Sequence, residues 1–268
     1  MTNLAELHGF PRYSLIGVLG GILESFDRFS PGDYDQQEIQ QSLLSIKLYL
    51  NDSNSHLESQ LPSSINESLS LIGLAISLAE IEVSVYDNSE REIYMSLLNS
   101  LIQLKGSFGK TVRAKQSERI RGLYVIIDPQ VTKGRDPLDI ARGAIRGGAR
   151  IIQLRDKLRD KGEIIPLAIE LKKLCQDNNL LLIINDHVDI AAALGPDNVG
   201  VHVGQTDLPV SHSRSILHES QLIGRSNREI PLLVESQEMG ADHVAFGAIY
   251  PTTTKPGGIG QRGNQGPE

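Results

Sequence analysis

Cysteine is nearly absent from the 268-residue chain, which contains only Cys175. A single cysteine excludes an internal disulfide and any metal cluster built on several cysteines. A cytoplasmic location is the simplest expectation for a chain without disulfides. Because Cys175 falls among apolar neighbours in an expected helix, we predict a small buried residue and not a nucleophile.

Positive charge is also scarce, with 26 Lys and Arg against 33 Asp and Glu and a net charge of −7. A nucleic-acid-binding protein would present a basic surface, so we expect no nucleic-acid partner. The balance still permits a local basic pocket for a phosphorylated ligand. Long apolar runs are missing too, and none approaches the ~20 residues of a membrane span. The N-terminus lacks the basic start of a signal peptide, so we expect neither a membrane partner nor a targeting segment.

Residues 1–105 are patterned as three or four amphipathic helices rich in Leu and Ser. Ser64 with Glu67, and Ser89 with Glu92, have the spacing of capping boxes that open two of these helices. An earlier helix has its apolar stripe at Ile39, Leu43, Ile46 and Leu50. This pattern predicts a small all-α domain whose stripes form a core, with packing or a homo-oligomer contact as its role.

Residues 106–121 carry five basic side chains against the single acid Glu118. A basic run of this kind is usually a solvated connector. We therefore expect a linker here, between the helical domain and the remaining residues 122–268.

From Gly122 onward, short β-branched runs alternate with helical stretches. The expected strands are Leu123–Ile127, Arg150–Leu154, Leu180–Ile184, Val199–Val203, Gln221–Gly224 and His243–Ile249. Continuous apolar strands alternating with helices indicate a parallel sheet covered by helices. Polar residues follow nearly every strand, as at the mouth of a (β/α) barrel, whereas a doubly wound sheet would concentrate them at one switch point. We therefore predict an α/β fold of the (β/α) TIM-barrel type.

Two acids, Asp186 and Asp207, follow neighbouring expected strands. Two carboxylates without a Cys or His cluster suit Mg²⁺, which takes its other ligands from water and substrate phosphates. Arg155, Lys157 and Lys255 stand at strand ends of the same region. A metal ion combined with Arg and Lys can hold a diphosphate and stabilise its departure. The side-chain amides of Gln153 and Asn185 can recognise a flat heterocycle, because each offers a hydrogen-bond donor and an acceptor side by side.

Each of these residues also has a purely structural interpretation. Residues 155–157 could form a surface ion-paired turn of little energetic value. Asp186 could cap the helix that begins near Val188. His202 lies inside a β-run and is expected to be a core histidine with its hydrogen bonds satisfied. The recurrence of charge at successive strand ends favours the functional interpretation over these alternatives.

Five motifs of the chain resemble, in the same order, those of the thiamine phosphate synthase family. They are Gln153–Lys157, Asn185–Asp189, Gly200–Pro209, Ile223–Ser226 and Gly247–Lys255. The resemblance implies a transferase that joins 4-amino-2-methyl-5-hydroxymethylpyrimidine diphosphate to hydroxyethylthiazole phosphate. The implied mechanism is dissociative, with diphosphate leaving before the thiazole nitrogen attacks, which agrees with many anion-stabilising groups and no nucleophile–base pair.

The resemblance also implies roles for individual residues. Asp186 and Asp207 would hold Mg²⁺. The pyrimidine diphosphate would be bound by Gln153, Leu154, Arg155, Asp156, Lys157, Asn185, Ser226 and Lys255. The catalytic contacts to the departing diphosphate would come from Lys157, Ser226 and Lys255. The thiazole phosphate would be touched by Thr252, Thr253 and Thr254.

The chain departs from the family pattern at its end and at several single positions. The 147 residues from Gly122 to Glu268 fall below the ~200 of a small complete barrel and hold about six strands. We therefore expect a truncated barrel that lacks two βα units and part of the thiazole-phosphate site. The departures at single positions are His187, Arg225, Asn227, Ala248 and Tyr250.

Two other functions stay open on the sequence alone. A barrel isomerase resembling thiazole tautomerase shares the fold but needs no diphosphate site. The residues that count against it are the retained Lys157, Asp186, Asp207 and Lys255. A non-catalytic protein that binds the pyrimidine diphosphate, or has a regulatory role, would be compatible with an incomplete barrel.

Overall fold

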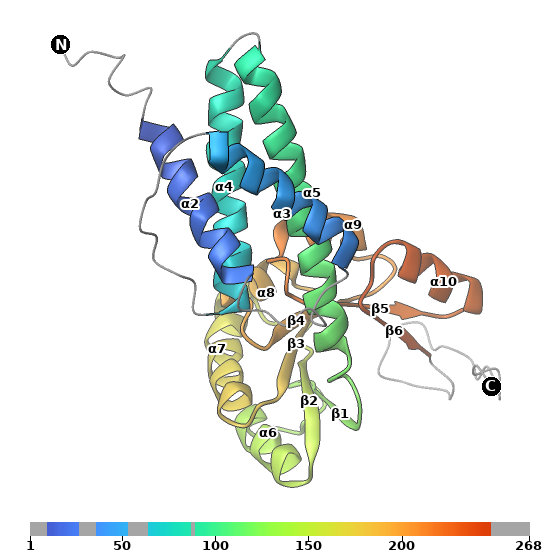
Figure 1. Cartoon of the computed structure of the whole chain (residues 1–268). Helices are drawn as coiled ribbons and strands as arrows, with labels where there is room; N and C mark the ends of the chain where they lie inside the picture. Colours follow the sequence, from blue (N-terminus) through green and yellow to red (C-terminus); the bar gives the residue numbers. More distant parts are fainter. Residues whose placement is uncertain (1–9, 27–35, 53–63, 87–88, 248–268) are drawn as a thin grey trace. The chain divides into compact units, whose positions relative to one another are not determined.

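The computed structural model describes residues 10–26, 36–52, 64–86 and 89–247. The chain divides into two compact units, Met1–Val112 and Arg113–Glu268. Figure 1 shows the first unit in blue to green and the second in green to red. Each unit has its own hydrophobic core.

The first unit consists of helices. They are α2 (Phe10–Phe26), α3 (Gln36–Asp52), α4 (Ile65–Val85) and α5 (Ser89–Ser117), of which α5 continues beyond the unit. The expected capping box at Ser64 is present in part, because Ser64 Oγ accepts a hydrogen bond of 3.2 Å from the backbone N–H of Glu67. Apolar stripes from all four helices form the core of this unit, including Leu19, Ile46 and Leu101.

Helix α4 is the single helix, among the residues described, that is long and apolar enough to cross a membrane. The expectation that no segment reaches that length is therefore wrong for this helix. Its stripe of Leu69, Ile72 and Ala79 is buried in the helical core. A core helix of a globular unit passes the same test of length and composition.

The linker expected at residues 106–121 is wrong for most of its length, because α5 continues to Ser117. The physical reason is the apolar stripe: Leu104, Phe108 and Val112 follow one another at helical spacing and are buried. Lysine and arginine are good helix formers, so the basic residues do not interrupt the helix. The boundary between the two units falls inside α5 and not in a loop.

The second unit contains a six-stranded parallel sheet whose spatial order follows the chain order. The strands are β1 (Leu123–Ile127), β2 (Ala149–Leu154), β3 (Leu181–Asn185), β4 (Val199–Val203), β5 (Ile223–Asn227) and β6 (His243–Phe246). The helices between them are α6 (Pro137–Arg146), α7 (Lys161–Asp177), α8 (Val188–Leu194), α9 (Val210–Ile216) and α10 (Ile230–Glu238). Figure 1 shows this alternation along the chain.

One face of this sheet packs against the helices. Its residues, such as Leu182 and Val201, share a core with Ala141 of α6, Ile164 of α7 and Ile190 of α8. The residues of the opposite face form a separate cluster of Ile151, Leu181, Ile183 and Leu222. A sequential parallel order with helices on one face is the arrangement of a (β/α) barrel, since a doubly wound sheet carries helices on both faces. The predicted fold class is confirmed, with six strands in the described part.

Cys175 lies on α7 and is fully buried in the core, as expected. Burial raises the pKa of its thiol to about 12, so the group stays protonated at neutral pH.

The expected fifth strand, Gln221–Gly224, is displaced, because β5 begins at Ile223. The buried Gln221 side chain instead donates hydrogen bonds to the backbone oxygens of Ala191 (2.8 Å) and Gly195 (3.2 Å).

Candidate active site

A hollow of about 350 Å³ opens at the carboxyl ends of strands β2 to β6. Its lining is formed by Arg155, Lys157, Asn185, Asp186, His202, Gly204, Gln205, Thr206, Asp207, Ser226, Arg228 and Gly247. Parallel strands bring their carboxyl ends to the same edge of a sheet, which is why residues far apart in the sequence meet here. Six of the residues predicted for the site lie together in this lining: Arg155, Lys157, Asn185, Asp186, Asp207 and Ser226.

Asp186 follows β3 in a left-handed backbone conformation, with φ of +63°. Aspartate tolerates this region better than most residues. The backbone N–H of Asp186 donates a hydrogen bond of 2.8 Å to the carbonyl oxygen of His202 on β4. This contact fixes the Asp186 backbone at the rim of the hollow.

Asp207 lies in the loop after β4, where its Oδ2 accepts a hydrogen bond of 2.7 Å from the backbone N–H of Gly204. A Cβ atom on residue 204 would lie 2.9 Å from this oxygen, so glycine is needed for the close approach. The pKa of Asp207 is raised, first by burial and then by the neighbouring Asp186 carboxylate, while the Gly204 hydrogen bond and Lys157 oppose the shift. The two carboxylates are therefore close enough to repel each other.

This pair of acids fits a hard divalent cation. No group of three or more His, Cys, Asp or Glu able to hold a metal occurs in the described ranges. Mg²⁺ does not need one, since it commonly uses one or two carboxylates and completes its shell with water and phosphate oxygens. A bound cation would also remove the repulsion that raises the pKa of Asp207.

Two basic side chains of the lining are already held by acids. Lys157 Nζ lies 2.7 Å from Asp186 Oδ2, and both side chains are partly exposed. Arg155 forms an ion pair with Asp128, a carboxylate that is 5% exposed and sits just after β1. The pair with Asp128 orients the Arg155 guanidinium on the β2 side of the hollow.

Three residues predicted to bind substrate have their side chains outside the lining. Leu154 is 1% exposed and packs in the core under the helices. Asp156 is also buried, and its Oδ2 lies 2.5 Å from Arg159 Nε. Gln153 lies on the opposite face of β2 from Leu154, where its Nε2 donates to the Tyr124 hydroxyl at 3.2 Å. Burial raises the pKa of Tyr124, so this hydroxyl stays protonated.

A chain of hydrogen bonds connects Ser226 to two histidines. His202 Nε2 lies 2.8 Å from Ser226 Oγ, and His202 Nδ1 lies 3.3 Å from His243 Nε2. Gly224 makes room for this pair, because a Cβ there would lie 2.0 Å from His243 Nε2 and 2.5 Å from His202 Nδ1. His202 is thus a satisfied buried histidine, as predicted, and it also lines the hollow.

Lys255, Thr252, Thr253 and Thr254 lie outside the described residues, so their predicted roles stay predictions. The sequence interpretation proposed no binding role for Gln205, Thr206 and Arg228 of the lining, and it gave His202 only a structural role. Gln205 and Thr206 come after Gly204 in the loop that follows β4, and Arg228 directly follows β5, so their positions near strand ends were the available signal.

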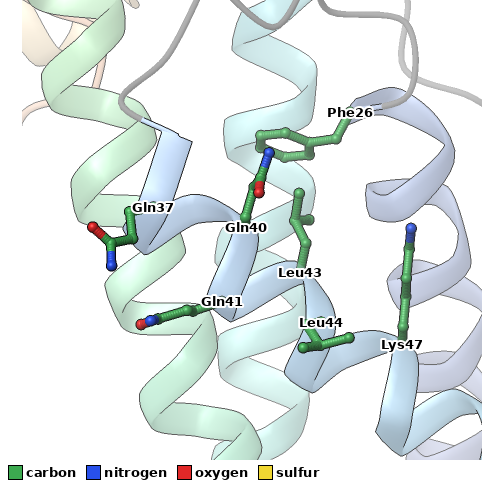
Figure 2. A pocket seen from close by; sticks show the side chains of 7 residues that line it. All are labelled: Phe26, Gln37, Gln40, Gln41, Leu43, Leu44 and Lys47. Carbon is green, nitrogen blue, oxygen red and sulfur yellow. The ribbon is translucent and has the colours of Figure 1, made fainter.

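The helical unit has a hollow of its own, of about 500 Å³, beside α3. Figure 2 shows its lining: Phe26 at the end of α2, and Gln37, Gln40, Gln41, Leu43, Leu44 and Lys47 along α3. Of the lining residues that lie in the described part of the chain, Lys47 alone is charged. Its described lining thus has no pair of acid and base like those at the strand ends of the second unit.

Helices on one face of a sequential parallel sheet, with acids and bases at the strand ends, define a (β/α)-barrel protein with a site suited to a phosphorylated ligand. The family model described as "Thiamine monophosphate synthase" matches residues 123–266. The chain belongs to this family.

Individual relatives agree with this assignment. The chain is 41% identical over 133 residues to a thiamine-phosphate synthase of Shouchella clausii, which covers 50% of the chain and 63% of the relative. It is 44% identical over 134 residues to that of Alkaliphilus oremlandii, with the same coverage of 50% and 63%. The chain thus spans less than two thirds of the length of these relatives. A solved thiamine phosphate pyrophosphorylase from Pyrococcus furiosus is 29% identical, with a TM-score of 0.47 and coverage of 51% of the chain and 64% of that structure.

Proposed function

We propose that the hollow at the strand ends binds 4-amino-2-methyl-5-hydroxymethylpyrimidine diphosphate with Mg²⁺. We further propose that the chain joins this pyrimidine to hydroxyethylthiazole phosphate, giving thiamine phosphate and diphosphate. The observation that carries the proposal is the convergence of Asp186, Asp207, Lys157 and Ser226 on one hollow of about 350 Å³. The likeness to thiamine-phosphate synthases over half of the chain supports the same reaction.

The proposed reaction begins when the bond between the pyrimidine methylene carbon and the diphosphate oxygen breaks. The electron pair leaves with the diphosphate, and the pyrimidinylmethyl group is left as a cation. The lone pair of the thiazole nitrogen then forms the new carbon–nitrogen bond. This sequence needs no protein nucleophile, and it gains most from groups that stabilise the departing anion.

The residues of the hollow have distinct parts in this scheme. Lys157 and the Ser226 hydroxyl would contact diphosphate oxygens, where negative charge increases as the bond breaks. The amide of Asn185 would hold the pyrimidine through its donor and acceptor atoms. Asp186 and Asp207 would hold Mg²⁺, which when bound supplies positive charge to the diphosphate.

The ion pair of Lys157 with Asp186 suggests how the site changes on loading. A cation held by Asp186 and Asp207 would compete with the Lys157 ammonium for the same carboxylate. Lys157 is 44% exposed and has a flexible stem, so its ammonium can move to a diphosphate oxygen at little cost.

The test is a direct assay of product. The full chain is incubated with both substrates and Mg²⁺, and thiamine phosphate and diphosphate are measured by mass spectrometry and a coupled diphosphate assay. We expect both products in equal amounts, and a loss of at least a hundredfold in rate for Asp207→Ala. The matched control is Asp189→Ala, an exposed acid on α8 paired with Lys161, which should keep the wild-type rate.

A folded chain that forms neither product would contradict the condensation. Binding of the pyrimidine diphosphate without product would then support the non-catalytic alternative, and conversion of a thiazole substrate alone would support an isomerase.

A further inference from the structure

A second group of basic residues surrounds a hollow at the other end of the sheet. This hollow measures about 530 Å³ and is lined by Arg119, Arg121, Gly122, Gly148, Arg150 and Asn179. These residues precede or begin strands β1, β2 and β3, whereas the candidate active site lies at the carboxyl ends of the strands. Among the residues that the structure describes, none in this lining is acidic.

A β-bulge places Arg150 in the hollow. Leu123 pairs with Ala149, and Tyr124 pairs with Ile151. Arg150 therefore lies between these two pairs on β2 and has no partner of its own on β1. A bulge of this kind re-aims a side chain that would otherwise follow the alternation of the strand. The stem of Arg150 lies against Gly122, where an added Cβ would be 3.3 Å from Arg150 Cγ.

Arg119 is held in place by neutral groups, and no carboxylate among the described residues pairs with it. Its Nη1 donates to Asn198 Oδ1 at 2.9 Å, and its Nη2 donates to Asn179 Oδ1 at 3.2 Å. Asn179 and Asn198 both have left-handed φ values, of +55° and +60°, in the turns that lead into β3 and β4. Partial burial lowers the pKa of Arg119, as expected for a cation without a nearby carboxylate.

The other two arginines of the hollow differ from the arginines of this unit that pair with carboxylates. Within the described ranges, the side chain of neither Arg121 nor Arg150 forms an ion pair or hydrogen bond. By contrast, carboxylates pair with Arg113, Arg142, Arg155, Arg159 and Arg214. Three guanidinium groups around one hollow repel each other unless an anion lies between them.

We propose that this hollow, which we call the arginine site, binds a polyvalent oxyanion, namely a phosphate or diphosphate group. Guanidinium groups bind such oxygens through paired N–H donors, and they do so better than ammonium groups. The hollow is larger than one phosphate, so it has room for the organic part of a phosphorylated small molecule. The arginine site does not depend on the proposed function, because it shares no residue with the candidate active site.

Calorimetry with inorganic diphosphate, in low salt and with EDTA to remove metals, tests the arginine site on the full chain. The wild type is compared with Arg121→Gln/Arg150→Gln, with Lys157→Gln at the active-site hollow, and with Arg142→Gln. Arg142 is an exposed arginine of α6 and controls for the loss of surface charge. Circular dichroism of each variant checks that it is folded.

We expect the wild type to bind diphosphate at the arginine site, and the double variant to bind it there at least tenfold more weakly. Lys157→Gln and Arg142→Gln should keep this binding. Glycerol phosphate is titrated as well: tighter binding than inorganic phosphate indicates an organic phosphate as the ligand, and equal binding indicates the free ion.

Binding that the double variant leaves unchanged, or that Arg142→Gln weakens equally, would overturn the proposal. The same holds if all diphosphate binding disappears in Lys157→Gln. Failure of the proposed active-site function would look different, because it would remove only the binding event that depends on Lys157.

Discussion

His243 Nε2 lies 3.3 Å from His202 Nδ1, and the two ring centroids are 5.4 Å apart. The far nitrogen of His243, Nδ1, is buried without a hydrogen-bond partner. Burying an N–H without an acceptor costs more free energy than burying a ring lone pair without a donor. We therefore expect the proton of the neutral His243 ring on Nε2. His202 Nδ1 then accepts it, and His202 Nε2–H donates to Ser226 Oγ. This leaves the Ser226 hydroxyl hydrogen available to a ligand in the hollow.

The first prediction concerns acid stability. Burial lowers the pKa of His243 from 6.5 to about 4, so the folded protein holds this side chain neutral. The unfolded chain binds the proton first as pH falls, and the free energy of unfolding should therefore drop between about pH 6.5 and pH 4. The shift corresponds to about 3 kcal/mol at most. Urea unfolding across this range measures the drop.

His243→Gln should flatten this dependence on pH, and His212→Gln should leave it unchanged because His212 is exposed on α9. An NMR titration that finds His243 protonating near its ordinary pKa would contradict the prediction.

The second prediction concerns the glycine beneath the two histidines. Gly224→Ala places a Cβ 2.0 Å from His243 Nε2, and one of the rings must move. We expect a loss of about 1–3 kcal/mol of stability from overpacking. Gly162→Ala on α7 is the control, since nothing lies within 4 Å of its added Cβ. That change should be neutral or stabilise the helix by up to ~1 kcal/mol, and equal effects of the two substitutions would contradict the packing described.

The third prediction concerns the paired acids. Burial and Asp186 raise the pKa of Asp207. The free energy of unfolding of the metal-free protein should therefore fall as pH rises above the ordinary pKa of an aspartate and Asp207 ionises. Asp207→Asn keeps an oxygen for the Gly204 N–H but removes the charge. Without metal at pH 7, this variant should melt at the same temperature as the wild type or higher.

Added Mg²⁺ should raise the melting temperature of the wild type and leave Asp207→Asn unchanged. Asp189→Asn, at an exposed ion pair, should respond to Mg²⁺ like the wild type. A Mg²⁺ response that survives in Asp207→Asn would show that the metal binds elsewhere.

The strands were the most predictable part of the fold. Continuous apolar runs gave Leu123–Ile127 and Val199–Val203 with the bounds that the structure has. The fifth strand was misplaced because Gln221 satisfies its hydrogen bonds through α8 and the turn after it, which only the tertiary structure reveals. The expected linker is mostly helix because the buried apolar stripe of Leu104, Phe108 and Val112 continues α5 through the basic residues.

The candidate site was predictable to the level of strand ends. Asp186, Asp207 and Lys157 could be placed there because parallel strands end at one edge. Side chains alternate between the two faces along β2, so Gln153 and Leu154 must face opposite ways. The motif resemblance assigned both residues to the substrate and did not take this alternation into account. The pairing of Asp156 with Arg159 depends on the conformation of the loop after β2, which the sequence does not specify.

Binding of the pyrimidine diphosphate to the strand-end hollow is the central claim, and calorimetric titration tests it most directly. The full chain is titrated with the pyrimidine diphosphate in Mg²⁺ and again in EDTA, alongside Asp186→Asn and Arg121→Gln/Arg150→Gln. We predict binding of one ligand in Mg²⁺, at least tenfold weaker in EDTA and in Asp186→Asn, and unchanged in the double arginine variant. Binding that is independent of both Mg²⁺ and Asp186 would contradict the assignment of this hollow as the diphosphate site.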